Sequence, residues 1–207
     1  MKRTETAVLV LLLTALFAAS SGVTGAYLTK RTGQLSNLVT PGEIKVKLTE
    51  PSWEKERGEN LLPGVSVPKD PAVTNTGNSD AWMFLKASVP VKTIRLVDAQ
   101  SKKAQAASPV ELFSFTAGDE WKLVEKTRQP DRTVYIYGYY KPLKPNETTE
   151  PLFEETVLVN YLEGELTAAD KLEMPVRAFA VQTGVSANER NPAEVYQSYL
   201  KQEGSGA

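Results

Sequence analysis

Apolar and polar side chains alternate with a period of two along most of the chain, and Pro, Gly, Asn and Asp interrupt the pattern at short intervals. In the segment EIKVKLT (43–49), Ile44, Val46 and Leu48 fall on one face and charged or polar residues on the other. This alternation is typical of an antiparallel strand with one face in water. We therefore expect a mainly β protein.

Other segments show the same alternation or form short β-branched and aromatic runs. The predicted strands are 43–49, 72–75, 81–89, 93–97, 111–115, 120–125, 133–140, 156–162 and 174–183. Many strands without intervening helical repeats favour an antiparallel β-sandwich or jelly roll over a parallel α/β sheet. The proline-rich segments 61–71 and 141–151 are predicted connectors, because proline cannot donate to a central ladder. The Ala-rich segment 102–108 is a loop or one helical turn.

One or two short helices complete the predicted fold. The segment 191–202 has Asn191 as N-cap, Pro192 at the first helical position and Glu194 at the third, a capping-box pattern. A shorter helix is expected at 166–171, with Thr167 as a cap. Residues 27–202 are predicted to form a single domain, followed by a disordered tail at 203–207.

A secretory signal precedes that domain. Lys2 and Arg3 come before the apolar run 7–19, and small residues follow the run. A permanent transmembrane helix is the alternative, but the run is shorter than the roughly 20 residues that a bilayer requires. Thr24 and Ala26 suit a signal-peptidase site, which makes Tyr27 the new N-terminus. We expect a secreted protein without a stable membrane span after processing.

The amino-acid composition excludes several classes of catalytic and metal-binding site. The chain has no cysteine and no histidine, which excludes thiol nucleophiles, Ser-His-Asp catalysis and the usual zinc ligands. Its formal net charge is −1 and its basic residues are scattered, so no nucleic-acid surface is expected. We predict no enzymatic activity, no catalytic residues, no metal and no cofactor.

Two clusters of oxygen-bearing side chains are candidates for a cation site or for catalysis by carboxylates. Asn75, Asn78 and Asp80 in TNTGNSD could bind a hard cation, but a turn suits them better. Glu154 and Glu155 could serve glycoside hydrolysis, but neighbours on a strand point to opposite faces, so solvated charge is the preferred interpretation.

Aromatic residues and a sequon complete the candidates. Tyr135, Tyr137 and Tyr139 would share one strand face, beside Tyr140, either as sheet-face packing or as a sugar-binding stripe; packing is preferred. The isolated residues Trp53, Trp82 and Trp121 are interpreted as structural. The glycosylation sequon at Asn146 is interpreted as a chance match.

Two stretches carry a resemblance to a known family. They are GAYLTKR followed by EIKVKLTEP, and LPGVSVPKDPAVTNTGNSDA leading into WMFLKASV; EMPVRAFAVQT adds a third likeness. In this order they resemble the TasA/camelysin family of exported bacterial proteins, which a SipW-type signal peptidase processes. Leu28 and Lys30 depart from the aromatic and acidic residues usual in that family.

The resemblance implies a jelly-roll protein of a Gram-positive-type cell surface or biofilm matrix that assembles into fibres with itself or with sister matrix proteins. In such fibres the segment after the cleavage site completes the sheet of a neighbouring subunit. The candidate donor strand here is 27–40, with anchors Tyr27, Leu28, Leu35, Leu38 and Val39. An intramolecular first strand or a flexible tail is the alternative for this segment.

Two other functions stay open beside fibre assembly. One is a monomeric surface module that binds a glycan or a protein. The other is a camelysin-like peptidase, which the absence of histidine and cysteine makes the weakest of the three.

Overall fold

The computed structural model describes residues 42–53, 61–167, 170, 172–184 and 191–204. They belong to one of the two units into which the chain divides, Gly42–Ala207; the other is Met1–Pro41. The predicted signal, its cleavage site and the whole candidate donor strand lie outside the described residues. So does the predicted tail, apart from residues 203 and 204, which continue the C-terminal helix.

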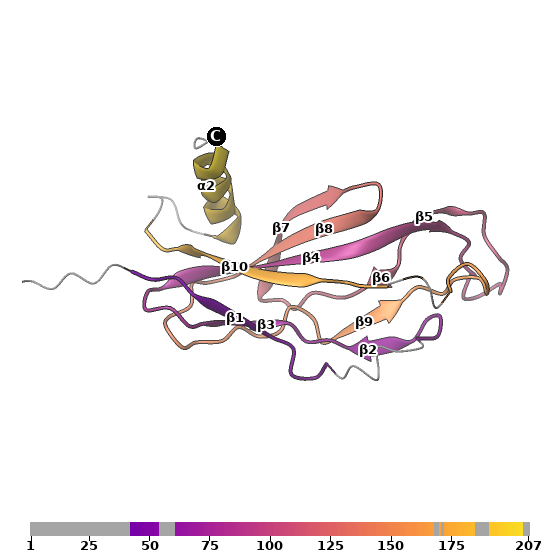
Figure 1. Cartoon of the computed structure of the whole chain (residues 1–207), viewed down its shortest axis with the longest axis horizontal. Coiled ribbons are helices and arrows are strands. Elements are labelled where there is room, and N and C mark those ends of the chain that lie inside the picture. Colours follow the sequence, from indigo (N-terminus) through magenta and orange to yellow (C-terminus); the bar gives the residue numbers. More distant parts are fainter. Residues whose placement is uncertain (1–41, 54–60, 168–169, 171, 185–190, 205–207) are drawn as a thin grey trace, which may run out of the picture. The chain divides into compact units, whose positions relative to one another are not determined.

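The described chain is mainly β, as the alternation predicts, and its sheets are antiparallel (Figure 1). The largest sheet has the order β10-β4-β8-β7, with β5 also paired to β4; two smaller sheets have the orders β1-β3 and β2-β9-β6. The strands are β1 (Val46–Thr49), β2 (Ser66–Pro68), β3 (Ala72–Asn75), β4 (Ala81–Ile94), β5 (Ser108–Glu111), β6 (Phe113–Ser114), β7 (Trp121–Arg128), β8 (Arg132–Tyr139), β9 (Glu155–Leu158) and β10 (Val176–Gln182).

The two smaller sheets are continuous with each other. Only three residues separate β2 from β3, and the segment 147–158 runs beside both. Asn75 N donates to Glu147 O at 2.9 Å, and Lys69 N donates to Glu154 O at 3.0 Å. The strand order across this surface is therefore β1, then β3 with β2, then the segment ending in β9, then β6.

Two hydrophobic clusters cover opposite faces of β4 and β8. Met83 and Leu85 of β4 enter the larger cluster, to which the smaller sheets also contribute. Trp82 and Phe84 enter the second, with Val195 and Tyr196 of the C-terminal helix α2 (Pro192–Gly204). This two-sided burial explains why β4 reads as a nearly unbroken apolar run.

The predicted cap of α2 is confirmed. Asn191 Oδ1 accepts a hydrogen bond from the backbone N–H of Glu194 at 3.0 Å, and Pro192 is the first helical residue. Val195 and Tyr196 are buried, and burying each contributes about 1.5–3 kcal/mol. The helix therefore holds its place by covering the outer face of the large sheet (Figure 1).

Pro90 does not end a strand, so the predicted strands 81–89 and 93–97 merge into β4 up to Ile94. At Pro90 the neighbour of β4 changes from β10 to β5. Only the carbonyl of Pro90 is used there, as acceptor from Leu112 N at 2.9 Å. Because the missing N–H falls at this exchange of neighbours, proline interrupts neither ladder in its middle.

Three further predictions need correction. The segment 111–115 is divided between β5 and β6, because the chain passes there from the large sheet to a small one. A strand, β2, lies inside the predicted connector 61–71. In 166–171, only residues 166, 167 and 170 are described, and none of these three is helical. Asp170 N donates to Thr167 O and the Asp170 carboxylate pairs with Lys92, which fixes these residues.

Candidate functional site

Among the described residues, strand β1 is hydrogen-bonded along one side only. Its partner is β3, and Lys45 O just before β1 accepts from Thr76 N at 2.9 Å. Because ladder groups alternate in direction along a strand, every second residue turns its N–H and C=O away from β3. These outward groups have no backbone partner within the described part of the chain; they belong to Ile44, Val46 and Leu48.

Strand β10 also ends its sheet. It pairs with β4, and the ladder continues one residue beyond it, where Ser88 N donates to Pro175 O at 3.0 Å. By the same alternation, three residues of β10 turn their backbone N–H and C=O groups away from β4: Val176, Ala178 and Ala180. The two rows are neighbours, since β1 contacts β10 and a Cβ built on Gly42 would lie 2.8 Å from Gln182 Nε2.

Strand β7 ends the large sheet at its other side and is protected against pairing. A bulge interrupts its register between Leu123 and Glu125. Most of its side chains are exposed and many are charged, and Tyr196 of α2 donates a hydrogen bond to Glu125 at 2.7 Å. Bulges and charges are devices by which sheet edges avoid unwanted strands. Strand β7 is therefore the less suitable edge for strand addition.

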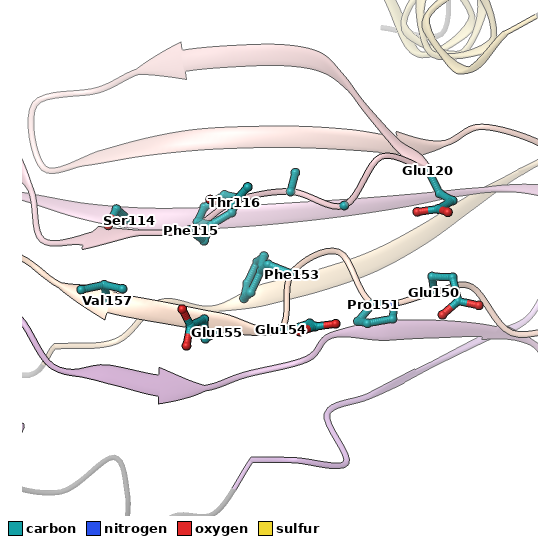
Figure 2. Close-up of a pocket in the computed structure, with 12 residues that line it drawn as sticks. Ser114, Phe115, Thr116, Glu120, Glu150, Pro151, Phe153, Glu154, Glu155 and Val157 are labelled. Carbon is teal, nitrogen blue, oxygen red and sulfur yellow. The ribbon is translucent and has the colours of Figure 1, made fainter.

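A cavity of about 630 Å³ opens beyond β6, between residues 114–120 and 150–157 (Figure 2). Strands β6 and β9 pair up to Ser114 and Val157, and the next bond runs from Gly118 N to Leu152 O at 2.8 Å. Within the described chain, no backbone hydrogen bond joins 115–117 to 153–156. The two chain segments separate here and leave main-chain groups facing the space between them.

The walls of this cavity are aromatic on one side and acidic at the rim. The rings of Phe115 and Phe153 lie 4.5 Å apart and continue the larger hydrophobic cluster. The carboxylates belong to Glu120, Glu150, Glu154 and Glu155 (Figure 2). Glu155 accepts a hydrogen bond from Ser66 Oγ. No Lys or Arg of the described residues forms an ion pair with any of the four.

Glu154 and Glu155 are both exposed, as the solvated-charge interpretation predicts, but the extended segment assumed for the pair is present only from Glu155. Glu154 lies in a bend and β9 begins at Glu155, so strand alternation does not separate the two side chains. Both line the same cavity. The strand pattern does not predict a role for Glu120 and Glu150, although the run EPLFEE (150–155) surrounds an apolar pair with carboxylates.

The turn predicted for TNTGNSD is confirmed. The buried amide of Asn75 donates to Ser79 O at 2.9 Å and to Leu143 O at 3.0 Å, and its Oδ1 accepts from Gly77 N at 3.0 Å. Both polar atoms of this side chain are thus used, within the turn and toward the neighbouring segment at Leu143. Asn75 therefore acts as the centre of a corner between β3 and β4.

A second cavity, of about 310 Å³, has a buried cation in its wall. Lys69 is 9% exposed, and its Nζ lies 2.8 and 2.9 Å from the two carboxylate oxygens of Glu50. The same Nζ is 5.1 Å from the ring centroid of Trp53. Trp53 lies beside this ion pair and is itself 40% exposed, while Trp82 and Trp121 are core residues.

The predicted tyrosine stripe packs on the sheet. Tyr139 is buried, and Tyr135 and Tyr137 are partly buried against the larger cluster. Tyr135 also donates a hydrogen bond to Glu111 at 2.6 Å. Burial acts to raise the pKa of the Glu111 carboxyl, but this hydrogen bond and the nearby Lys126 and Arg128 hold it below its ordinary value. Sheet packing, not a free aromatic stripe, is therefore confirmed.

No group of three or more acidic, histidine or cysteine side chains within the described ranges is arranged to hold a metal ion. None of the helices described has the length and apolar character needed to cross a membrane. Comparison with protein-family models, curated proteins and solved structures found no match.

Proposed function

We propose that this chain is an exported structural protein of a bacterial cell surface or matrix, which assembles by adding an extended segment of one copy to an open sheet edge of another. The observation that carries the proposal is the main chain at the sheet edges, whose outward N–H and C=O groups have no backbone partner among the described residues. Such backbone N–H and C=O groups lie on the outer sides of β1 and β10. Others lie along 115–117 and 153–156, beside the cavity of Figure 2. Unpaired edges accept extended peptides through main-chain hydrogen bonds, largely independently of side-chain identity.

The resemblance to the TasA/camelysin family supports this proposal, because the motifs that carry it form strands and a buried turn of the fold. KLTEP ends β1, the Asn-Thr-Gly element forms the buried turn of Asn75, and VRAFAVQ is β10. A Cβ on Gly77 would lie 2.3 Å from Glu43 O, so this glycine allows the chain before β1 to approach the turn. We propose that the sheets together form the jelly-roll sandwich expected for that family.

Export and processing belong to the same proposal. A SipW-type peptidase would cleave between Ala26 and Tyr27, and 27–40 would then be free to act as the donor strand. The chain has no histidine and no cysteine, which supports a non-enzymatic role over a camelysin-like peptidase.

Protein beginning at Tyr27 tests the proposal. Size-exclusion chromatography and negative-stain electron microscopy should show filaments for this protein. A matched protein with one additional residue before Tyr27 should assemble poorly, because the extra residue disturbs the end of the donor strand. Stable monomers from both proteins, across concentrations, would contradict the proposal.

The cavity of Figure 2 favours a second candidate, a monomeric surface module that binds a small or extended ligand. Its volume lies within the range of about 300–1,000 Å³ typical of ligand sites. The same experiment separates the two functions, since a binding module stays monomeric whichever residue comes first.

A further inference from the structure

The outer face of the large sheet changes from apolar to polar along β4. Trp82 and Phe84 are buried in the second hydrophobic cluster, which α2 shares. The next two residues on this face are Lys86, which is exposed, and Ser88, which is partly buried. A cavity of about 180 Å³ lies there. Three cationic side chains line it: Lys86, Arg132 and Arg177.

The register of the sheet brings these cations to one place. Arg177 of β10 is directly opposite Lys86 of β4, and Arg132 of β8 lies two rows farther along the same face. Ser88 and its partner Val134 form the row between them, and both line the cavity. Successive rows on one face are about 7 Å apart. Two cations therefore stand at one end of the cavity and one at the other.

Lys86 and Arg177 face each other as like charges. Like charges directly opposite in an antiparallel pair destabilise that pair. Neither residue forms an ion pair with another described residue. Arg132 differs, because its guanidinium lies 2.6 Å from the Asp131 carboxylate. An anion held in the cavity would relieve the repulsion between Lys86 and Arg177.

A further carboxylate on this face is engaged elsewhere. Glu125 of β7 lies in the same row as Lys86, with Ile136 between them. Its carboxylate accepts hydrogen bonds from Thr127 and Tyr196, both at 2.7 Å. Glu125 does not line the cavity. The cavity thus keeps an excess of positive charge.

The lining groups match the chemistry of a phosphate group. Guanidinium groups donate paired hydrogen bonds to phosphate oxygens, and the ammonium group of lysine adds a point charge. The Ser88 hydroxyl and the Gln129 amide line the same cavity and add uncharged donors. Three cations offset by Asp131 leave an excess of about two positive charges, and a phosphate monoester carries about −1.5 to −2 at pH 7. A carboxylate would supply only one negative charge.

We propose that this basic cavity is a binding site for a phosphate group, held by Lys86, Arg177 and Arg132 above Ser88. The phosphate is either the free ion or a monoester carried on a larger molecule, since both present the same charged oxygens. The site uses side chains on a sheet face. It therefore goes beyond the proposed assembly, which uses main-chain groups at sheet edges.

Isothermal titration calorimetry with inorganic phosphate at constant ionic strength tests the site in protein beginning at Tyr27. K86Q/R177Q should weaken phosphate binding about tenfold or more, because it removes hydrogen bonds from charged donors. The control K47Q/K103Q removes two exposed positive charges elsewhere and should bind like the unmodified protein. S88L keeps every charge but fills the floor of the cavity, so it should also weaken binding.

Methyl phosphate and acetate define the ligand class in the same titration. Tighter binding of methyl phosphate than of inorganic phosphate would support a phosphate carried on a larger molecule, and the reverse order would support the free ion. Acetate should bind more weakly than either, because it has one charge and two oxygens. Acetate that binds as tightly as phosphate would contradict the phosphate class.

Urea denaturation checks that the variants fold and gives a second measurement. In chloride alone, K86Q/R177Q should be at least as stable as the unmodified protein, because it removes an opposed pair of like charges. Phosphate should raise the urea midpoint of the unmodified protein more than that of the variant, since a bound ligand stabilises the folded state. General effects of the salt act on both proteins.

Three results would overturn the site. They are no measurable phosphate binding by the unmodified protein, equal binding by K86Q/R177Q, and an equal loss of binding in K47Q/K103Q. The last result would mean that phosphate responds to the overall charge of the protein instead of to this cavity.

Discussion

Gly138 lies where the large sheet and helix α2 come closest. A Cβ at this position would be 2.4 Å from Pro192 Cβ and 2.8 Å from Phe84 Cε1. Neither neighbour is the free end of a flexible side chain. The glycine in the aromatic run TVYIYGYY therefore provides room for the start of the helix.

We predict that G138A lowers the free energy of unfolding by about 1–3 kcal/mol, the usual cost of overpacking a core. Urea denaturation followed by tryptophan fluorescence measures the change. G118A is the matched control, because its Cβ would lie no closer than 3.4 Å to any atom. Equal stability of the two variants would contradict the close approach of α2.

Asn75 is the residue on which the corner between β3 and β4 depends. N75A removes two donated hydrogen bonds and one accepted bond inside the protein. Each buried polar group left without its partner costs about 1–3 kcal/mol, so the loss should exceed 2 kcal/mol. T76A, at an exposed neighbouring position, should change stability by less than about 0.5 kcal/mol.

The same variants separate a turn from a cation site at this residue. If Asn75 only builds the turn, adding calcium should not change the urea midpoint of either the unmodified protein or N75A. A midpoint that rises with calcium only while Asn75 is present would contradict the structural role.

At the scale of elements, α2 is tied to the edge strand β7 by one charged hydrogen bond. Tyr196 donates to the Glu125 carboxylate at 2.7 Å, and this bond is the main reason that the pKa of Glu125 lies below its ordinary value of 4.5. A carboxyl with a lowered folded-state pKa stabilises the fold above its unfolded-state pKa. That contribution is lost as the pH falls through the lower, folded-state value.

We predict that Y196F lowers stability by about 1 kcal/mol near neutral pH, the typical worth of such a bond. The difference between Y196F and the unmodified protein should shrink as the pH falls below 4.5. Urea midpoints measured from pH 7 to pH 3 check this sign. A difference that stays constant over that range would mean that the hydroxyl does not act through ionised Glu125.

Local pattern predicted most elements because most strands bury one face. The alternation at 43–49, the apolar run of β4 and the cap of α2 each depend on neighbouring residues alone. The segment β2 lies among prolines and is a strand because β9 pairs with it. Pro90 is tolerated because β4 changes its neighbour there. Such long-range pairings leave no periodic signal in the sequence.

The cavity beyond β6 was predictable only in part, for the same reason. The carboxylates of EPLFEE are visible in the sequence, but Glu120 joins them only because Gly118 N pairs with Leu152 O. The gap itself arises where two strands separate, which depends on tertiary pairing. Residue types thus indicated charge at this place, and the fold was needed to make it a site.

At the scale of the whole molecule, the proposed assembly joins the segment 27–40 of one copy to the main chain at a sheet edge of another copy. The segment contains Lys30 and Arg31 and no acidic residue, and four carboxylates line the cavity of Figure 2. Ion pairs at a partly exposed site weaken as salt increases, whereas main-chain hydrogen bonds respond less. Assembly should therefore weaken at high salt without being abolished.

Electron cryomicroscopy of assembled protein beginning at Tyr27 tests the central claim most directly. The account predicts a map in which an extended segment from one copy runs along an open sheet edge of the next copy. Filaments held together only by side-chain faces, with every sheet edge unoccupied, would contradict it.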